Sequence, residues 1–286
     1  MTRTQHLWTI VFAVGVLGRA LTAQQPAAAP TPGSARAIAP VDLTGNWVSV
    51  VTEDWRFRMV TPPKGDYASV PLNAAARAVA DAWDPAKDTA AGNACKSYGA
   101  AGIMRVPGRL RISWQDDTTL KIETDAGTQT RLLHFAGTPG GDPSWQGYSA
   151  AVWELAGGAP GRGGPPPPAP AGGTVTPPAG GAAAAPGAAG PGRGGRGGAP
   201  PRGGSLKVTT TRLKEGYLRK NGVPYSENAV VTEYFDRHTE SNGDEWFTVT
   251  TIVDDPKYLG QSFITSTHFK KEANGSKWSP SPCKAS

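Results

Sequence analysis

One segment of the chain comes close to the pattern of a nucleophilic serine. Gly147-Tyr148-Ser149-Ala150-Ala151 matches Gly-x-Ser-x-Gly except at its last position. In enzymes that motif places the serine on a strand-to-helix turn, and an acid and a histidine follow later in the chain. Here the segment lies inside a strand-like stretch with no helical pattern after it. The sequence therefore favours a structural serine, and we assign no catalytic residue.

Three histidines follow the N-terminal region, and metal binding is the chemistry they could perform. His134, His238 and His268 have no short metal-ligand spacing, although three strands could bring them together. His268 stands beside Phe269 in a strand-like run, where a hydrogen-bonded structural histidine is the ordinary case. We expect neither a metal nor a cofactor.

A phenol and two carboxylates gather around one predicted turn. Tyr225-Ser226-Glu227 belong to this turn, and Glu233 follows in the next strand-like stretch. Such groups could act as general acid and base, so an enzymatic site would lie within residues 222–233. Hydrogen bonding within turns and between strands is the commoner role of the same residue types. The sequence favours this structural role.

Aromatic residues near residue 50 give the strongest indication of function. If a period of two persists, one face of the first strand carries Trp47, Ser49, Val51, Glu53, Trp55 and Phe57. An interior that mixes aromatic and polar side chains suits a small amphipathic ligand. We predict ligand contacts at Trp47, Glu53, Trp55 and Phe57, with Tyr225 and His268 at the rim or wall. A solid core rich in aromatic residues is the alternative.

Strand-like stretches position these residues. Apolar and polar residues alternate over 109–114, 119–123, 128–135, 229–237, 245–254 and 263–272, with turn signals such as Asn242-Gly243 between them. One helix is expected over 74–83, capped by Asn73, with Val79 and Trp83 docking on the sheet. About eight or nine strands with a single short helix predict an all-β fold, an antiparallel meander closed into a β-barrel. A two-layer β-sandwich is the alternative.

A tract of low complexity divides the strand pattern. Ser144–Leu155 and Ser205–Leu213 are predicted to be the two arms of one β-hairpin. Of the 48 residues from 157 to 204, 41 are Gly, Ala or Pro, which cannot bury a core. We therefore expect one β domain over 42–283 with a disordered insertion. The segment from Gly192 to Gly198 is similar to RGG segments that bind nucleic acid, but it has no interleaved aromatic residues.

The N-terminus predicts export. Leu7–Gly18 is an apolar run, and Leu21-Thr22-Ala23 offers a cleavage site, so residues 1–23 fit a signal peptide. The run is too short to remain as a stable membrane anchor. Residues 24–41, rich in Ala and Pro, predict a flexible leader. The protein is then secreted or periplasmic.

The charge and the cysteines narrow the class of protein further. The net charge of +6 comes from arginines in residues 1–23 and in the tract, so the folded body is neutral overall and predicts no nucleic-acid partner. Cys95 and Cys283 are the only cysteines, and in an exported protein they most simply form one disulfide. Two free buried thiols are the alternative.

Several short motifs resemble those of known families. Gly45-Asn46-Trp47 is similar to the Gly-x-Trp that begins the first strand of lipocalins and other calycin barrels. A group of uncharacterised exported β-proteins of acidobacteria and proteobacteria shares more motifs with the chain. These are Cys95, Gly99 and Met104; Trp145, Gly147, Ser149, Trp153 and Glu154; Gly222, Val223, Pro224, Tyr225, Ser226 and Glu227; Glu233 and Phe235; and Asp255-Pro256.

Two features depart from that group. Tyr225 stands where its members usually have histidine, and residues 132–137 lack the Asp-Gly-Arg turn of many members. The resemblance implies a fold and an exported location but no activity. We predict an exported, calycin-like protein that binds a small, partly apolar ligand. An extracytoplasmic enzyme with its site in 222–233 and a structural or envelope-interaction protein are the alternatives.

Overall fold

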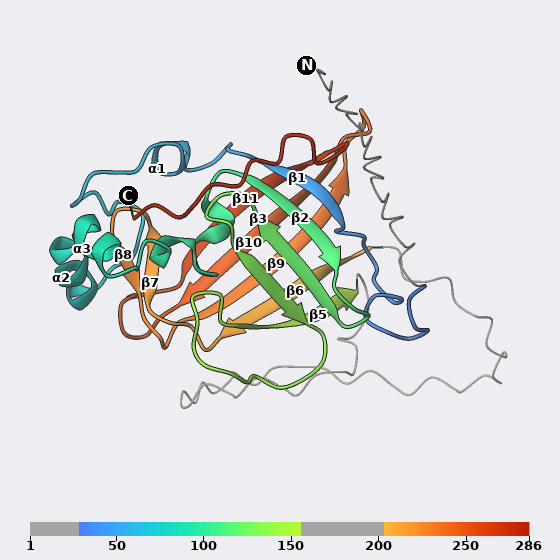
Figure 1. Cartoon of the computed structure of the whole chain (residues 1–286), viewed down its shortest axis with the longest axis horizontal. Helices are drawn as coiled ribbons and strands as arrows, with labels where there is room; N and C mark the ends of the chain where they lie inside the picture. Colours follow the sequence, from blue (N-terminus) through green and yellow to red (C-terminus); the bar gives the residue numbers. More distant parts are fainter. Residues whose placement is uncertain (1–28, 156–202, 286) are drawn as a thin grey trace, which may run out of the picture.

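Nine strands close into a barrel in the computed structural model, which describes residues 29–155 and 203–285 (Figure 1). The barrel strands are β1 (Gly45–Val50), β2 (Arg109–Trp114), β3 (Thr119–Thr124), β4 (Thr130–His134), β5 (Tyr148–Leu155), β6 (Gly204–Thr211), β9 (Val230–Thr239), β10 (Glu245–Asp254) and β11 (Phe263–Glu272). Their order around the barrel is β1-β11-β10-β9-β6-β5-β4-β3-β2, and β2 pairs with β1 to close it. The all-β barrel prediction is confirmed, and the sandwich alternative is wrong.

The path is not a pure meander. β4 and β5 pair in parallel, with Leu133 opposite Ser149, whereas the other neighbouring barrel strands are antiparallel. Between β6 and β9 the chain leaves the barrel and forms a separate two-stranded sheet, β7 (Gly216–Arg219) and β8 (Val223–Tyr225). This excursion covers one end of the barrel and supplies part of the candidate site.

The strands on either side of the low-complexity tract form one pair, as predicted. β5 and β6 are antiparallel from Tyr148 opposite Thr211 to Leu155 opposite Gly204. The tract itself, the expected signal peptide and the first residues of the expected leader lie outside the described residues. The leader prediction is wrong for its second half, because Trp153 Nε1 donates to the carbonyl of Ala35 at 2.9 Å. Ala39 and Val41 also pack against the core.

Helices are more numerous than the sequence predicted. They are α1 (Trp55–Arg58), α2 (Ala74–Ala82) and α3 (Pro85–Ala90), with 3-10 turns η1 (Lys96–Tyr98) and η2 (Ile103–Arg105). The prediction for α2 is confirmed, since the Asn73 side chain accepts from the N–H of Ala76 at 3.0 Å. Its buried face carries Ala76 and Ala80, and Val79 is 39% exposed, so the docking face expected at Val79 is wrong. Within the described helices, none is long and apolar enough to cross a membrane.

The first strand is shorter than the aromatic pattern predicted. β1 ends at Val50, its last partner on β11 being His268, and four residues later the chain turns into α1. Asp54 adopts a left-handed conformation (φ 48°), and its carbonyl accepts the N–H groups of Phe57 and Arg58. The alternation of inward and outward side chains therefore stops before Trp55, which is 66% exposed.

The interior of the barrel has two different layers. At the end where β1 begins and β11 ends, here called the aromatic end, Trp47, Phe235, Phe247 and Phe269 are buried, and Phe247 contacts the other three rings at centroid distances of 4.7–6.0 Å. At the opposite end, here called the polar end, the buried inward side chains include Arg131, Ser149, Thr210, Glu233 and Thr251. Residues 29–43 lie at the aromatic end, whereas α1, α2, α3 and the β7–β8 sheet lie at the polar end (Figure 1).

Candidate anion-binding site

Three arginines from distant parts of the chain converge on one small pocket at the polar end. The pocket has a volume of about 40 Å³. Its lining residues are Phe57, Arg58, Thr61, Ser97, Gly102, Arg105, Val106, Pro107, Leu218, Arg219 and Lys220. The arginine pocket, named for Arg58, Arg105 and Arg219, has room for roughly three water molecules or one small oxyanion.

Each of these arginines is the last residue of a short helix, turn or strand, which orients its side chain. Arg58 is the last residue of α1, and Arg105 ends the 3-10 turn η2. Arg219 ends β7, where the register with β8 shifts between Tyr217 and Arg219, and such irregularities commonly redirect a side chain. Gly102 allows close packing here, because a Cβ at this position would lie 3.1 Å from the carbonyl oxygen of Tyr217.

The guanidinium groups of Arg58 and Arg105 are each fixed on one side and open on another. Arg58 donates from Nε to the carbonyl of Arg105 at 2.9 Å and forms an ion pair with Glu53 through Nη1. Arg105 donates from Nη2 to Asp54 Oδ2 at 2.9 Å. Arg58 Nη2 and Arg105 Nη1 are buried and have no hydrogen-bond acceptor within the described residues.

Arg219 has the fewest partners of the three arginines, because no carboxylate among the described residues forms an ion pair with it. Its Nη1 donates to the carbonyl of Ala68 at 2.7 Å, and its guanidinium carbon lies 4.3 Å from the ring centroid of Phe57. Nε and Nη2 of Arg219 are buried without an acceptor in the described part of the chain, and so is the hydroxyl of Ser97. Buried donors are satisfied in most proteins, so this concentration of free donors in one pocket indicates a ligand that supplies acceptors.

The local electrostatics favour a negatively charged ligand. Burial lowers the pKa of Arg219 to about 10, and the nearby charge of Arg105 acts in the same direction. Burial also lowers the pKa of Arg58, where the charge of Glu53 opposes the shift and that of Arg105 adds to it. Glu53 and Asp54 each engage one of the three arginines. An anion in the pocket would relieve the remaining repulsion.

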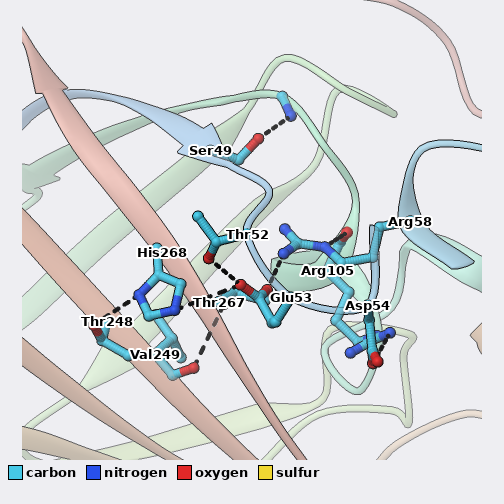
Figure 2. Close-up of polar contacts among 11 residues, drawn as sticks. Ser49, Thr52, Glu53, Asp54, Arg58, Arg105, Thr248, Val249, Thr267 and His268 are labelled. Carbon is cyan, nitrogen blue, oxygen red and sulfur yellow. Dashed lines mark hydrogen bonds and ion pairs between the residues drawn. The ribbon is translucent and has the colours of Figure 1, made fainter. Parts of the chain in front are cut away.

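Glu53 links the pocket to the outer face of the barrel. Figure 2 shows its carboxylate between the guanidinium of Arg58 and the imidazole of His268. His268 Nε2 lies 3.5 Å from Glu53 Oε2, and its Nδ1 lies 3.1 Å from Thr248 Oγ1. Thr52 Oγ1 also donates to Glu53 Oε2 at 2.8 Å. These contacts hold the carboxylate that in turn holds Arg58.

The structure separates the residues that the sequence grouped as one ligand-binding set. Glu53 and Phe57 belong to the arginine pocket or its support, and His268 reaches it only through Glu53. Trp47 is fully buried in the aromatic end, and Tyr225 is fully buried in the polar end. Trp55 is exposed on α1. The expectation that these side chains line one strand face is wrong beyond Val50.

The three arginines were missed by sequence reasoning. Arg58 lies in the segment that the sequence predicted to continue the first strand, which ends at Val50, and neither Arg105 nor Arg219 lies in a recognisable motif. The only sequence signal was that each follows apolar residues, Ile103 and Met104 before Arg105 and Leu218 before Arg219.

The groups within residues 222–233 do not converge on a surface site. Ser226 donates from its N–H and its hydroxyl to Asp255 at 2.6 and 2.8 Å, which stabilises the turn. Glu227 pairs with Lys257 on the surface. The Tyr225 hydroxyl is buried, which raises its pKa, and it has no hydrogen-bond partner in the described chain.

Glu233 forms a buried ion pair inside the barrel. Its carboxylate accepts from Arg131 Nη2 at 2.6 Å and from Nη1 at 3.1 Å, and both side chains are fully buried. Thr210 accepts from Arg131 at 3.4 Å and shares a 2.7 Å hydrogen bond with Ser149. Ser149 therefore sits within a strand in the interior, as the sequence indicated, and not on a nucleophile turn. In the described residues no cluster of three or more His, Cys, Asp and Glu side chains could hold a metal.

A larger pocket near the aromatic end is less suited to an anion. It has a volume of about 380 Å³ and is lined by Lys270, Lys271 and Lys277, among others. Each of these ammonium groups already lies within 4 Å of a carboxylate, on Asp244, Glu245 and Glu272 respectively. The arginine pocket is smaller, but its donors are free.

The predicted disulfide is confirmed, and it fastens the cover of the polar end. Cys95 and Cys283 are bonded, joining the segment before η1 to the C-terminal residues. Comparison with known proteins gives no match to a family model, a curated protein or a solved structure.

Proposed function

We propose that this protein is an extracytoplasmic binding protein that captures an oxyanionic group, phosphate or carboxylate, in the arginine pocket. The observation that carries the proposal is the set of four buried guanidinium nitrogens and one hydroxyl without acceptors around a single small cavity. An oxyanion presents several acceptor atoms at once and matches the planar fork of arginine. The disulfide supports the exported location, since such bonds persist in oxidising compartments.

The pocket is built before the ligand arrives. Arg58 and Arg105 are held by Glu53 and Asp54, and Arg219 is held by a backbone carbonyl and by the face of Phe57. Groups fixed in this way lose little side-chain entropy on binding, which favours affinity. The walls contributed by Phe57, Val106 and Leu218 add apolar contact, so the ligand is a molecule with an anionic group and an apolar neighbour.

Calorimetric titration of the purified protein with inorganic phosphate, sulfate, acetate and phenyl phosphate tests the proposal. Binding of at least one of these anions is expected for the natural protein, together with thermal stabilisation of about 2.7 kcal/mol at a hundredfold excess over Kd. Arg219→Met should lose this response. Lys277→Met removes the same charge from the larger pocket and should keep it. Equal responses of the two variants, or no response of the natural protein, would overturn the proposal.

A further inference from the structure

Three large apolar side chains are exposed within six residues beside the arginine pocket. Trp55, Met59 and Val60 are 66%, 60% and 68% exposed. Phe57, Arg58 and Thr61 of the same segment line the pocket. The apolar side chains and the anion-binding donors thus belong to one short piece of chain, which runs along the outside of the polar end (Figure 1).

The geometry of α1 separates these two sets of side chains. The N–H of Met59 bonds to the carbonyl of Trp55 at 2.9 Å, so these residues are one helical turn apart and share a face. Arg58 is 8% exposed and points inward, whereas Trp55 and Met59 are turned toward solvent. An anion held by Arg58 would therefore lie behind a rim of exposed apolar groups.

The pocket volume limits how much of a ligand can enter. About 40 Å³ accepts the oxyanion and little else, so the rest of the ligand must lie outside, next to residues 55–60. We propose that the ligand group is the phosphate of an anionic phospholipid in a bilayer, with Trp55, Met59 and Val60 entering the headgroup region. This inference rests on the proposed function and names the source of its anion.

Charge complementarity supports this partner. Arg56 and Lys220 add positive charge around the pocket; Arg56 pairs with Asp66, and Lys220 lies over the ring of Tyr98. Glu53, Asp54 and Asp66 pair with Arg58, Arg105 and Arg56, which leaves Arg219 and Lys220 without a carboxylate partner among the described residues and gives this cluster an excess of positive charge. Tryptophan beside arginine is typical of the membrane–water interface, where the ring lies among headgroups and the cation meets phosphate.

Vesicle binding of the full chain tests the inference. Phosphatidylcholine vesicles with and without phosphatidylglycerol are the probes, with sedimentation and the tryptophan emission maximum as readouts. We expect binding only with phosphatidylglycerol, weakened by salt, and a blue shift of the emission. The double variant Trp55→Ser/Met59→Ser should bind these vesicles at least about tenfold more weakly than the natural protein, since it removes the inserted apolar area.

Calorimetry with inorganic phosphate separates this inference from the function it rests on. The double variant should bind inorganic phosphate as the natural protein does, because Trp55 and Met59 do not line the pocket. Arg219→Met should lose both ligands, and Lys277→Met should lose neither. Phosphate binding without vesicle binding overturns the membrane inference and leaves the anion site intact. Vesicle binding by the double variant that equals that of the natural protein overturns the membrane inference as well. If the natural protein binds neither inorganic phosphate nor the vesicles, both proposals are overturned.

Discussion

The two ends of the barrel are filled and covered by different kinds of side chain. At the aromatic end, packed aromatic rings fill the interior, and the indole N–H groups of Trp47 and Trp153 bond to carbonyls of Leu43 and Ala35 in the covering segment. At the polar end, charged groups are buried both inside the barrel and under its cover. The indole donors of Trp47 and Trp153 are thus satisfied at one end, whereas the cover of the other end gathers several donors without acceptors around one pocket, which is the arrangement expected of a site selected for binding at some cost in stability.

Within the polar end itself, the two buried arginine groups also differ. Arg131 has a bidentate carboxylate partner, whereas Arg219 has none in the part of the chain that the structure describes, so the first belongs to a structural ion pair and the second keeps open donors. This contrast can be tested by substitution, from the largest expected effect to the smallest.

The largest effect is expected at the interior ion pair. Glu233→Leu leaves the Arg131 guanidinium buried and unpaired, and should lower the free energy of unfolding by about 3–5 kcal/mol. Urea denaturation measures the change. The double variant Glu233→Leu/Arg131→Met should recover most of the loss, and failure to recover it would show that the pair does more than balance its own charges.

The second effect concerns the disulfide at the polar end. Cys95→Ser/Cys283→Ser should lower the free energy of unfolding by about 2–4 kcal/mol. Hydrogen exchange should then rise at residues 95–105, which the bond fastens, and change little at residues 35–43 of the aromatic end. Equal increases at both ends would contradict the independent closure of the two ends.

A third, smaller effect has the opposite sign. Arg219→Met removes a buried cation without a carboxylate partner and should stabilise the anion-free protein by about 1–2 kcal/mol at neutral pH, a rise in Tm of several degrees. Destabilisation in anion-free buffer would contradict the assignment of Arg219 as an unpaired donor.

The pH dependence of this stabilisation has a definite sign. Burial lowers the pKa of Arg219 from its ordinary value to about 10 on folding, so the folded state disfavours the cation and the stability contributed by this residue rises as pH increases above 10. The advantage of Arg219→Met over the natural protein should therefore shrink between pH 10 and 12. Comparing the two proteins cancels the common titration of lysines and tyrosines.

The smallest effect is expected at Trp55. Because its side chain is largely exposed, Trp55→Ala should change the free energy of unfolding by less than about 0.5 kcal/mol. The sequence alone had suggested a buried anchor on a strand, which would cost several times more. A thermal denaturation experiment distinguishes the two.

The barrel was predictable because most of its strands carry their own alternation. β2, β3, β9, β10 and β11 lie where period-two patterns predicted them, and the pairing of β5 with β6 followed from the composition between them. Arg131 and Glu233 were also readable in principle: Arg131 stands two residues before the inward Leu133, and Glu233 stands between the inward Val231 and Phe235. Opposite charges at inward positions indicate an internal ion pair.

The arginine pocket was not predictable for a physical reason. Its members are 47 and 114 residues apart in the chain and sit on a one-turn helix, a 3-10 turn and an irregular strand end, none of which has a strong periodic signal. The end of β1 was equally hard to predict, because the sequence pattern of a strand continues after Val50 although no neighbouring strand pairs with the chain beyond that residue. Tertiary packing, not local pattern, decided both.

The pairing of β5 with β6 has a practical consequence for orientation. Leu155 and Gly204 face each other at the aromatic end, whereas α1 and β7, which carry Arg58 and Arg219, lie at the opposite end of the barrel (Figure 1). The last described residues lie near the pocket instead, with the N–H of Lys284 bonded to the hydroxyl of Tyr98. A biotin or fluorophore attached at the aromatic end beside this strand pair would anchor the protein to a sensor with its pocket facing the solution, whereas a C-terminal tag would crowd the pocket.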